Sequence, residues 1–122
     1  MSTILIVEDN EKNMKLFRDV LTARGYRTLE AVSGEDAIEL ALSAVPSLVL
    51  MDLQLPGMDG GEALERLRGD ERTAAIPVLA LTAQAMHGDR ERFLDAGFDG
   101  YLSKPVDIVE LLRTVHEHCA RG

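Results

Sequence analysis

Residues 48–52 read Leu-Val-Leu-Met-Asp, in which the continuously apolar run Leu48–Met51 is followed by the carboxylate of Asp52. Two other short runs are as apolar, Ile-Leu-Ile-Val within Thr3–Val7 and Val-Leu-Ala-Leu at Val78–Leu81. A strand that is apolar on every side chain must be buried on both faces, which is typical of a parallel sheet covered by helices. These three runs therefore predict the centre of a parallel sheet.

Two weaker runs and five helical patterns surround this centre. Tyr26–Ala31 mixes polar and apolar residues and predicts an edge strand, and Gly100–Leu102 predicts a short fifth strand. Apolar residues at helical spacing lie over about residues 11–24, from Ser33, after Asp59, over about residues 85–96 and from Asp107. Ser33, Asp59 and Asp107 each precede an acidic residue by three positions, which is the capping-box spacing of a helix start. Gly25 and Gly97 are the expected helix ends.

Five strands alternating with five helices predict an α/β fold, a doubly wound parallel sheet covered on both faces. The edge character of the second strand favours the strand order 2-1-3-4-5. In open sheets of this kind, ligands bind beyond the carboxyl ends of the strands, at the switch point between strands 1 and 3.

Length and composition restrict the class of protein. The 122 residues show no linker or repeat, so we expect one domain over residues 1–122. With 13 Lys plus Arg against 21 Asp plus Glu, the net charge of -8 disfavours binding to nucleic acid. No apolar run approaches the roughly 18 residues of a membrane span, and the start lacks the basic segment of a signal peptide. The single cysteine, Cys119, suits a reducing compartment, so we expect a cytoplasmic protein without a membrane segment.

Polar residues follow the predicted strands at the edge where the sheet should bind a ligand. These are Glu8, Asp9, Asp52, Thr82 and Lys104. Each has an ordinary explanation taken alone; Asp9, for example, could simply cap the next helix. Together, three clustered carboxylates favour a hard cation such as Mg²⁺, which completes its shell with water and a phosphate. A carboxylate can also act as a nucleophile toward a phosphoryl group. The pattern therefore predicts a Mg²⁺-dependent aspartate that accepts a phosphoryl group.

The same residues bear on three other functions. A dinucleotide site needs glycines in the first turn, whereas residues 8–12 are acidic and contain none. An aspartate-based Mg²⁺-dependent small-molecule phosphatase resembling the haloacid-dehalogenase pattern would have an acid two residues after Asp52, where this chain has Gln54. A scaffold that only binds proteins would not need Asp52 or Lys104, and both are present. The phosphatase remains the alternative.

Four motifs in this order and spacing, ILIVEDN, LVLMDLQLPGMDG, LALTA and YLSKP, resemble the receiver domain of two-component response regulators. The resemblance extends over residues 3–120 and implies the flavodoxin-like (CheY-like) fold. The opening residues resemble stand-alone cell-division regulators of this family, although receivers excised from hybrid histidine kinases share much of the pattern. The implied function is a phosphorelay signalling module with self-catalysed phosphoryl transfer and slow autodephosphorylation, rather than an enzyme that turns over substrate.

The resemblance also implies a role for each matching residue. Asp52 is the phosphoacceptor, Asp9 a direct Mg²⁺ ligand, and Glu8 an acid that holds the metal largely through water. The remaining implied roles are the Gln54 backbone carbonyl as a metal ligand, Thr82 as the switch hydroxyl, Lys104 as the phosphate-pairing lysine, Tyr101 as the aromatic switch, Pro105 as the proline in cis linkage to Lys104, and Ala83 as the small residue that keeps the site open. Gln54 and Gln84 bear on the lifetime of the phosphoryl group.

The implied partners are a histidine kinase or a histidine phosphotransfer protein as donor, and a protein target that binds the fourth helix, fifth strand and last helix. We expect no output domain, and a monomer or weak dimer. His116 and His118 are two apart on a helix and are expected to be exposed rather than to bind metal.

Overall fold

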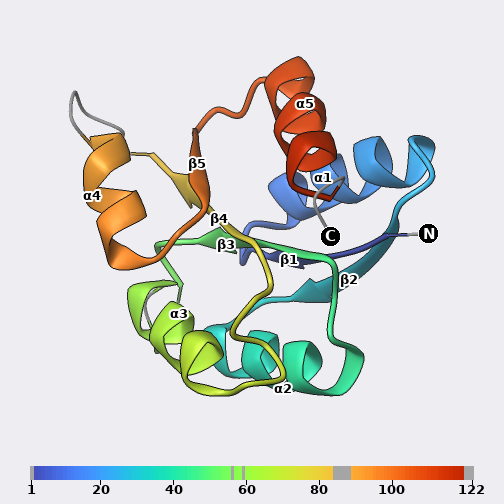
Figure 1. The fold of residues 1–122 in the computed structure, drawn as a ribbon. Coiled ribbons are helices and arrows are strands. Elements are labelled where there is room, and N and C mark those ends of the chain that lie inside the picture. The colour runs from blue at the N-terminus through green and yellow to red at the C-terminus, as the bar shows by residue number, and fades with distance from the viewer. Residues whose placement is uncertain (1, 56, 59, 84–88, 120–122) are drawn as a thin grey trace.

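The computed structural model describes residues 2–55, 57–58, 60–83 and 89–119. In these residues five strands alternate with five helices: β1 Thr3–Val7, α1 Glu11–Ala23, β2 Arg27–Ala31, α2 Gly34–Ala44, β3 Leu48–Asp52, α3 Gly60–Gly69, β4 Val78–Thr82, α4 Asp89–Ala96, β5 Gly100–Ser103 and α5 Ile108–Cys119. The strands pair in parallel in the order β2-β1-β3-β4-β5, and Figure 1 shows the helices on both faces of this sheet. The predicted fold class and strand order are confirmed.

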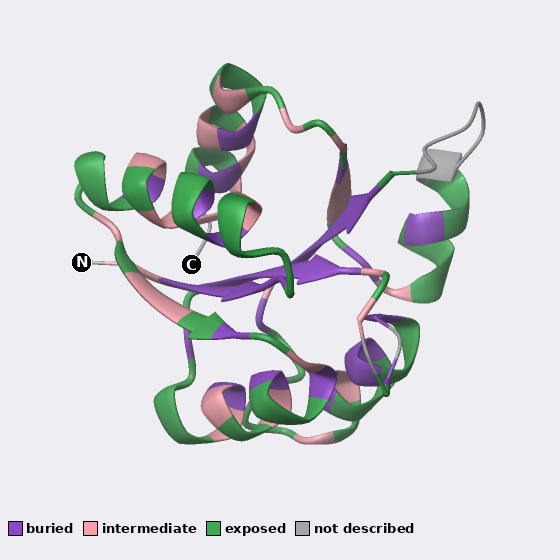
Figure 2. Cartoon of the chain, turned by 180° about the vertical axis from the view of Figure 1, so that it is seen from behind, coloured by how far each residue is buried: buried purple, intermediate pink, exposed green. Residues whose placement is uncertain are grey.

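The alternation of side chains along the strands divides the core into two layers. Leu5 and Val7 face the layer that contains buried residues of α2, α3 and α4, whereas Ile4 and Ile6 face the layer that contains buried residues of α1 and α5. In Figure 2 the central strands are buried along their length, and each helix is buried only on its inner side. Successive strand residues point to opposite faces, so a fully apolar strand supplies both layers at once.

The second strand begins one residue later than predicted, because Tyr26 takes part in the end of α1. Tyr26 is not part of β2, because its N–H donates to the carbonyl of Leu21 at 3.2 Å, while the N–H of Gly25 donates to that of Thr22 at 3.0 Å. These two bonds form a Schellman motif, which requires a left-handed backbone at the residue after the cap. Gly25 supplies it with φ 91°, as expected of the predicted helix stop.

Two of the three predicted helix caps are confirmed by the structure. The Ser33 hydroxyl accepts from the N–H of Asp36 at 3.2 Å, and the Asp107 carboxylate accepts from the N–H of Glu110 at 3.1 Å, so both predicted caps are present. The predicted cap Asp59, and residues 85–88 of the predicted fourth helix, lie outside the described residues. That helix is described from Asp89 to Ala96 and ends before Gly97, as predicted.

Among the described residues, none of the helices combines the length and the apolar character that crossing a membrane requires.

Candidate functional site

Asp52 is the last residue of β3 and is almost fully buried, with 3% of its surface exposed. The Lys104 ammonium donates to Asp52 Oδ2 at 2.9 Å, and the Gln54 N–H donates to Oδ1 at 2.9 Å. The following loop returns close to this residue, because a Cβ placed on Gly60 would lie 2.9 Å from the Asp52 carbonyl oxygen. A buried carboxylate needs hydrogen-bond donors, and here each oxygen of Asp52 has one, from Lys104 or from the Gln54 N–H.

Glu8 follows β1 and is also buried, with 1% of its surface exposed. Its Oε1 atom lies 2.9 Å from the Lys104 ammonium, which therefore bridges Glu8 and Asp52. The start of α1 supplies two more donors: the Asn13 side-chain amide to Oε1 at 3.1 Å and the Asn10 N–H to Oε2 at 3.4 Å. Asn10 and Asn13 therefore each bind one oxygen of Glu8, and sequence reasoning singled out neither of them.

Asp9 is exposed and completes an acidic cluster with Glu8 and Asp52. One oxygen from each of the three carboxylates lies within 4.8 Å of the others. The alternative explanation for Asp9 was that it caps α1, but Asp9 does not do so. Asn10 does, since its side-chain oxygen accepts from the N–H groups of Lys12 and Asn13 at 3.0 and 3.1 Å. An Asn directly before a helical pattern is a favoured N-cap, so the signal for Asn10 was present in the sequence.

The buried charges shift one another's pKa. Burial raises the pKa of Glu8, and its hydrogen bond with Asp52 raises it further. Burial also opposes ionisation of Asp52, but its hydrogen bonds with Glu8, with the Gln54 N–H and with Lys104 outweigh this effect and hold the pKa of Asp52 below its usual value. Burial alone would lower the pKa of Lys104, yet its bonds to Glu8 and Asp52 raise it. The lowered pKa keeps Asp52 ionised at neutral pH, which suits a nucleophile.

Thr82 ends the neighbouring strand β4 and is buried. Its carbonyl accepts from the N–H of Lys104 at 2.8 Å, which fixes the backbone that carries the lysine. The Lys104–Pro105 peptide bond is cis. Ala83 is exposed next to Thr82, and Gln84 lies outside the described residues.

Tyr101 is not part of this cluster. It lies within β5 opposite Ala80, half-buried, and its ring centroid is 5.3 Å from that of Phe93 on α4. The predicted exposure of His118 was wrong, since His118 is half-buried, with Nδ1 2.8 Å from the Thr114 carbonyl and Nε2 3.4 Å from that of Asp99. His116 is exposed, as expected.

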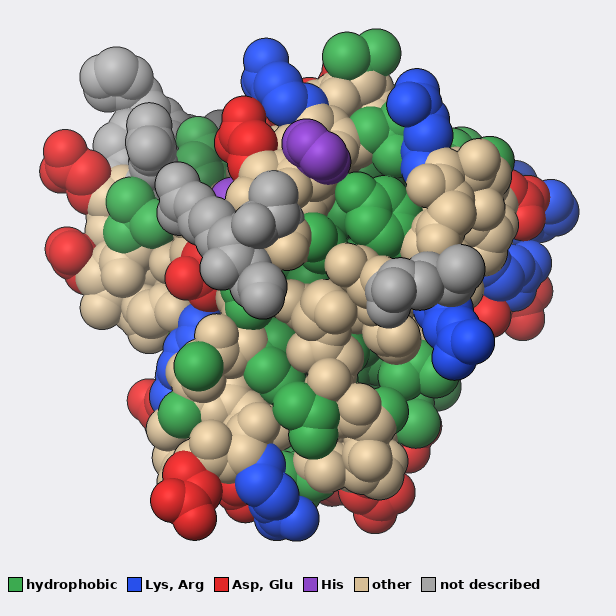
Figure 3. All heavy atoms as spheres, turned by 45° about the vertical axis from the view of Figure 1, so that its right-hand side comes forward, with side chains coloured by type: hydrophobic (Ala, Val, Ile, Leu, Met, Phe, Trp, Pro, Cys, Tyr) green, Lys and Arg blue, Asp and Glu red, His purple; other side chains and the backbone are tan. Residues whose placement is uncertain are grey.

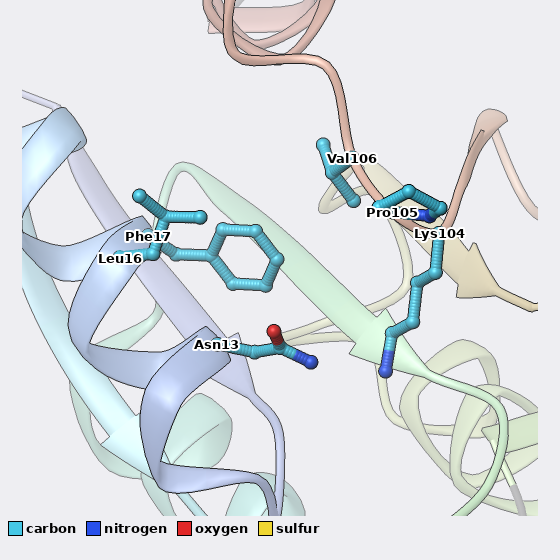
Figure 4. A pocket seen from close by; sticks show the side chains of 6 residues that line it. All are labelled: Asn13, Leu16, Phe17, Lys104, Pro105 and Val106. Carbon is cyan, nitrogen blue, oxygen red and sulfur yellow. The ribbon is translucent and has the colours of Figure 1, made fainter.

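A hollow of about 370 Å³ adjoins the cluster between α1 and the segment after β5. Figure 4 shows its lining residues: Asn13, Leu16, Phe17, Lys104, Pro105 and Val106. In this view the side chains of Asn13 and Lys104 project into the same space from opposite sides. The polar end of the hollow is therefore continuous with the acidic cluster.

The donor set fits Mg²⁺. Three carboxylates from the ends of β1 and β3 offer hard oxygen ligands, and the exposure of Asp9 leaves room for the waters that Mg²⁺ retains. The Gln54 N–H binds Asp52, which fixes the backbone from which the Gln54 carbonyl was expected to act as a ligand.

These features define a receiver domain. The family model of the response regulator receiver domain matches residues 4–116, and the chain belongs to this family. It is 46% identical over 116 residues to the polar-differentiation response regulator DivK of Brucella ovis, covering 95% of this chain and 94% of that protein.

Solved structures agree with this assignment. The receiver domain of the sensor histidine kinase PA1611 from Pseudomonas aeruginosa PAO1, which has a magnesium ion coordinated in its active site cleft, is 37% identical with a TM-score of 0.89 and covers 98% of both chains. The chemotaxis protein CheY4 of Vibrio cholerae is 26% identical with a TM-score of 0.88, covering 96% of this chain and 98% of that chain. Both neighbours share the fold described above.

Proposed function

We propose that residues 1–122 form a single-domain response regulator that accepts a phosphoryl group from a phosphohistidine donor onto Asp52 with the help of Mg²⁺. The observation that carries this proposal is the constellation at Asp52. An ionised, buried carboxylate lies 2.9 Å from the Lys104 ammonium and within 4.8 Å of oxygens from Glu8 and Asp9.

The transfer balances with the residues at hand. A carboxylate oxygen of Asp52 attacks the phosphorus, a P–O bond forms as the donor's P–N bond breaks, and the leaving imidazole nitrogen takes up a proton from water. Lys104 and Thr82 stabilise the charge of the transferred group, since one carries an ammonium and the other a hydroxyl at the adjoining strand end. Glu8, Asp9, Asp52 and the Gln54 carbonyl would hold Mg²⁺, which when bound neutralises charge on the phosphoryl oxygens.

The same chemistry would serve an aspartate-based phosphatase, but Gln54 has no ionisable group to assist hydrolysis of the acyl phosphate. We therefore expect one phosphoryl group per chain and slow loss of it. Repeated release of phosphate from a generic phosphoester would favour the phosphatase instead.

A histidine kinase or a histidine phosphotransfer protein is the proposed donor, and output is proposed to occur through the surface of α4, β5 and α5. A polar hollow of about 360 Å³ between β5 and α5 supports this surface; Tyr101, Ser103, Glu110 and His118 contribute to its lining. In Figure 3, Lys and Arg side chains are interspersed with Asp and Glu, which, like the net charge of -8, disfavours a nucleic-acid partner. A cytoplasmic location, a monomeric or weakly dimeric state and a role in cell division, the last supported by the likeness to DivK, are part of the same proposal.

The test is labelling with acetyl phosphate or a phosphorylated donor in the presence and absence of Mg²⁺. Asp52→Ala should abolish labelling, as should removal of Mg²⁺ with a chelator. Asp95→Ala, which removes an exposed carboxylate on α4, is the matched control and should be labelled like the parent. Full labelling of Asp52→Ala would contradict the assignment of Asp52 as the phosphoacceptor.

A further inference from the structure

In the described part of the chain, the side chain of Asn13 on α1 donates a hydrogen bond to Glu8, a carboxylate of the acidic cluster. Asn13 occupies the third position of the helix, where a Glu or Gln often reaches back to the cap residue. Here the Asn10 side chain accepts from the backbone N–H of Asn13. The side-chain amide of Asn13 does not reach back to the cap and instead donates to Glu8 Oε1 at 3.1 Å. The half-buried position of Asn13, at the edge of the hollow in Figure 4, keeps this bond partly shielded from water.

As a result, the two oxygens of Glu8 differ in the number and length of the hydrogen bonds that they accept. Oε1 receives two donors, the Asn13 amide at 3.1 Å and the Lys104 ammonium at 2.9 Å. Oε2 receives the Asn10 N–H at the longer distance of 3.4 Å. The oxygen with the weaker bond is the one more readily directed to a cation or its water, so the pair of donors on Oε1 sets the orientation of the carboxylate.

Loss of Asn13 would leave Oε1 dependent on Lys104, which also pairs with Asp52. Glu8 could then rotate with the lysine, and its charge would lose one stabilising donor in a buried place. Residues that orient a ligand from behind typically change metal affinity 10- to 100-fold when they are removed.

We propose that Asn13 is a positioning residue that sets the affinity of the site for Mg²⁺ by orienting Glu8. This inference rests on the proposed function, because it takes the acidic cluster to be a Mg²⁺ site. Asn13 touches neither the metal nor the phosphoryl group in this scheme and acts only through Glu8.

The experiment measures Mg²⁺ binding by titration calorimetry and the Mg²⁺ concentration for half-maximal labelling by acetyl phosphate. Asn13→Leu, which keeps the size of the side chain and removes its donor, should weaken Mg²⁺ binding about tenfold and raise the half-maximal Mg²⁺ concentration equally. The labelling rate at saturating Mg²⁺ should stay close to that of the parent. Asn13→Gln, which retains an amide donor, should lose less affinity than Asn13→Leu.

Thr22→Leu is the matched control, an uncharged polar residue replaced at an exposed place near the other end of α1. It should bind Mg²⁺ like the parent. An unchanged Mg²⁺ affinity in Asn13→Leu, or a loss equal to that in Asn13→Gln, would overturn the role of Asn13. Failure of the parent itself to bind Mg²⁺ would overturn the proposed metal site and the inference with it. If Asn13→Leu does not fold, Asn13→Ser takes its place with the same expected loss.

Discussion

At the scale of single residues, three positions carry an unfavourable local feature: two buried carboxylates and one valine with a left-handed backbone. Asp52 and Glu8 are carboxylates in the buried interior, and each is compensated by at least two donors. Val45 is a different case, since it has a left-handed backbone with φ 44° at the end of α2. A β-branched residue rarely adopts this conformation, which costs about 1–2 kcal/mol.

We expect Val45→Asn to stabilise the protein by about 1 kcal/mol, because Asn tolerates a left-handed backbone. Val45 is 50% exposed, so little packing is lost. The free energy of unfolding from urea titration measures the effect. Val32→Asn, at another exposed valine that does not have a positive φ, is the control and should bring no gain. A Val45→Asn protein no more stable than the parent would contradict a cost at this position.

Cys119 in the last turn of α5 is expected to react slowly. Burial raises the pKa of its thiol, against the lowering effect of a hydrogen bond with Ser2. A raised pKa leaves less of the reactive thiolate at any given pH. The rate of alkylation by iodoacetamide in the folded protein should therefore reach its midpoint at a higher pH than in urea-unfolded protein. Identical midpoints in both states would show that the thiol is not shielded.

At the scale of elements, the polar contacts at the ends of helices hold the layers in place. Arg68 in the last turn of α3 donates to the carbonyls of Ala74, Ile76 and Gly97 at 3.1, 2.6 and 3.0 Å, and pairs with the Asp99 carboxylate at 2.8 Å. Asp99 also accepts from the N–H of Val78 at 2.8 Å. One side chain thus connects α3 with the start of β4 and with the turn between α4 and β5.

Replacing Arg68 by Met should lower the free energy of unfolding by about 1.5–3 kcal/mol, the range for bonds to a charged donor. Amide hydrogen exchange should also rise in the turn between α4 and β5, because Asp99 and three carbonyls lose a donor. Arg66→Met, at an exposed arginine of the same helix, is the control for loss of charge. Equal effects of the two substitutions would mean that the Arg68 contacts contribute little.

At the scale of the whole molecule, the question is how a group on Asp52 changes the surface of α4, β5 and α5. Full hydrogen bonds from Thr82 and Lys104 to a phosphoryl group are worth at most about 2.5–6 kcal/mol, against roughly 5.5 needed to move a population from 1:99 to 99:1. Only contacts that differ between the two states count. Since Lys104 already lies 2.9 Å from Asp52 and from Glu8, its share is reduced, and we expect a partial switch completed by a bound partner.

Thr82→Ala should therefore leave phosphorylation of Asp52 nearly intact and remove its effect at a distance. In the parent, movement of Thr82 toward the phosphoryl group would let Tyr101 turn inward from its present contact with Phe93. Amide exchange over β5 and the described part of α4 should change on phosphorylation of the parent and not of Thr82→Ala. The same change in both proteins would rule out this route.

Much of this architecture could be predicted from local chemistry. Continuous apolar runs identified the three central strands, and the caps at Ser33 and Asp107 followed from their spacing to an acid. Tyr26 was placed wrongly because the Schellman bonds that close α1 compete with the start of β2. Asp9 and Asn10 are both favoured N-cap residues, and the path of the chain gave the role to Asn10.

By itself, the sequence determined the layers, the strand order and the edge at which the acids gather, because period and apolar character are properties of neighbouring residues. Which atoms meet at that edge was decided by tertiary structure alone. Lys104 bridges Glu8 and Asp52, Asn13 reaches Glu8, and Arg68 reaches Asp99. These contacts join residues on different elements, and side-chain directions across elements depend on how the layers pack, which no local pattern encodes.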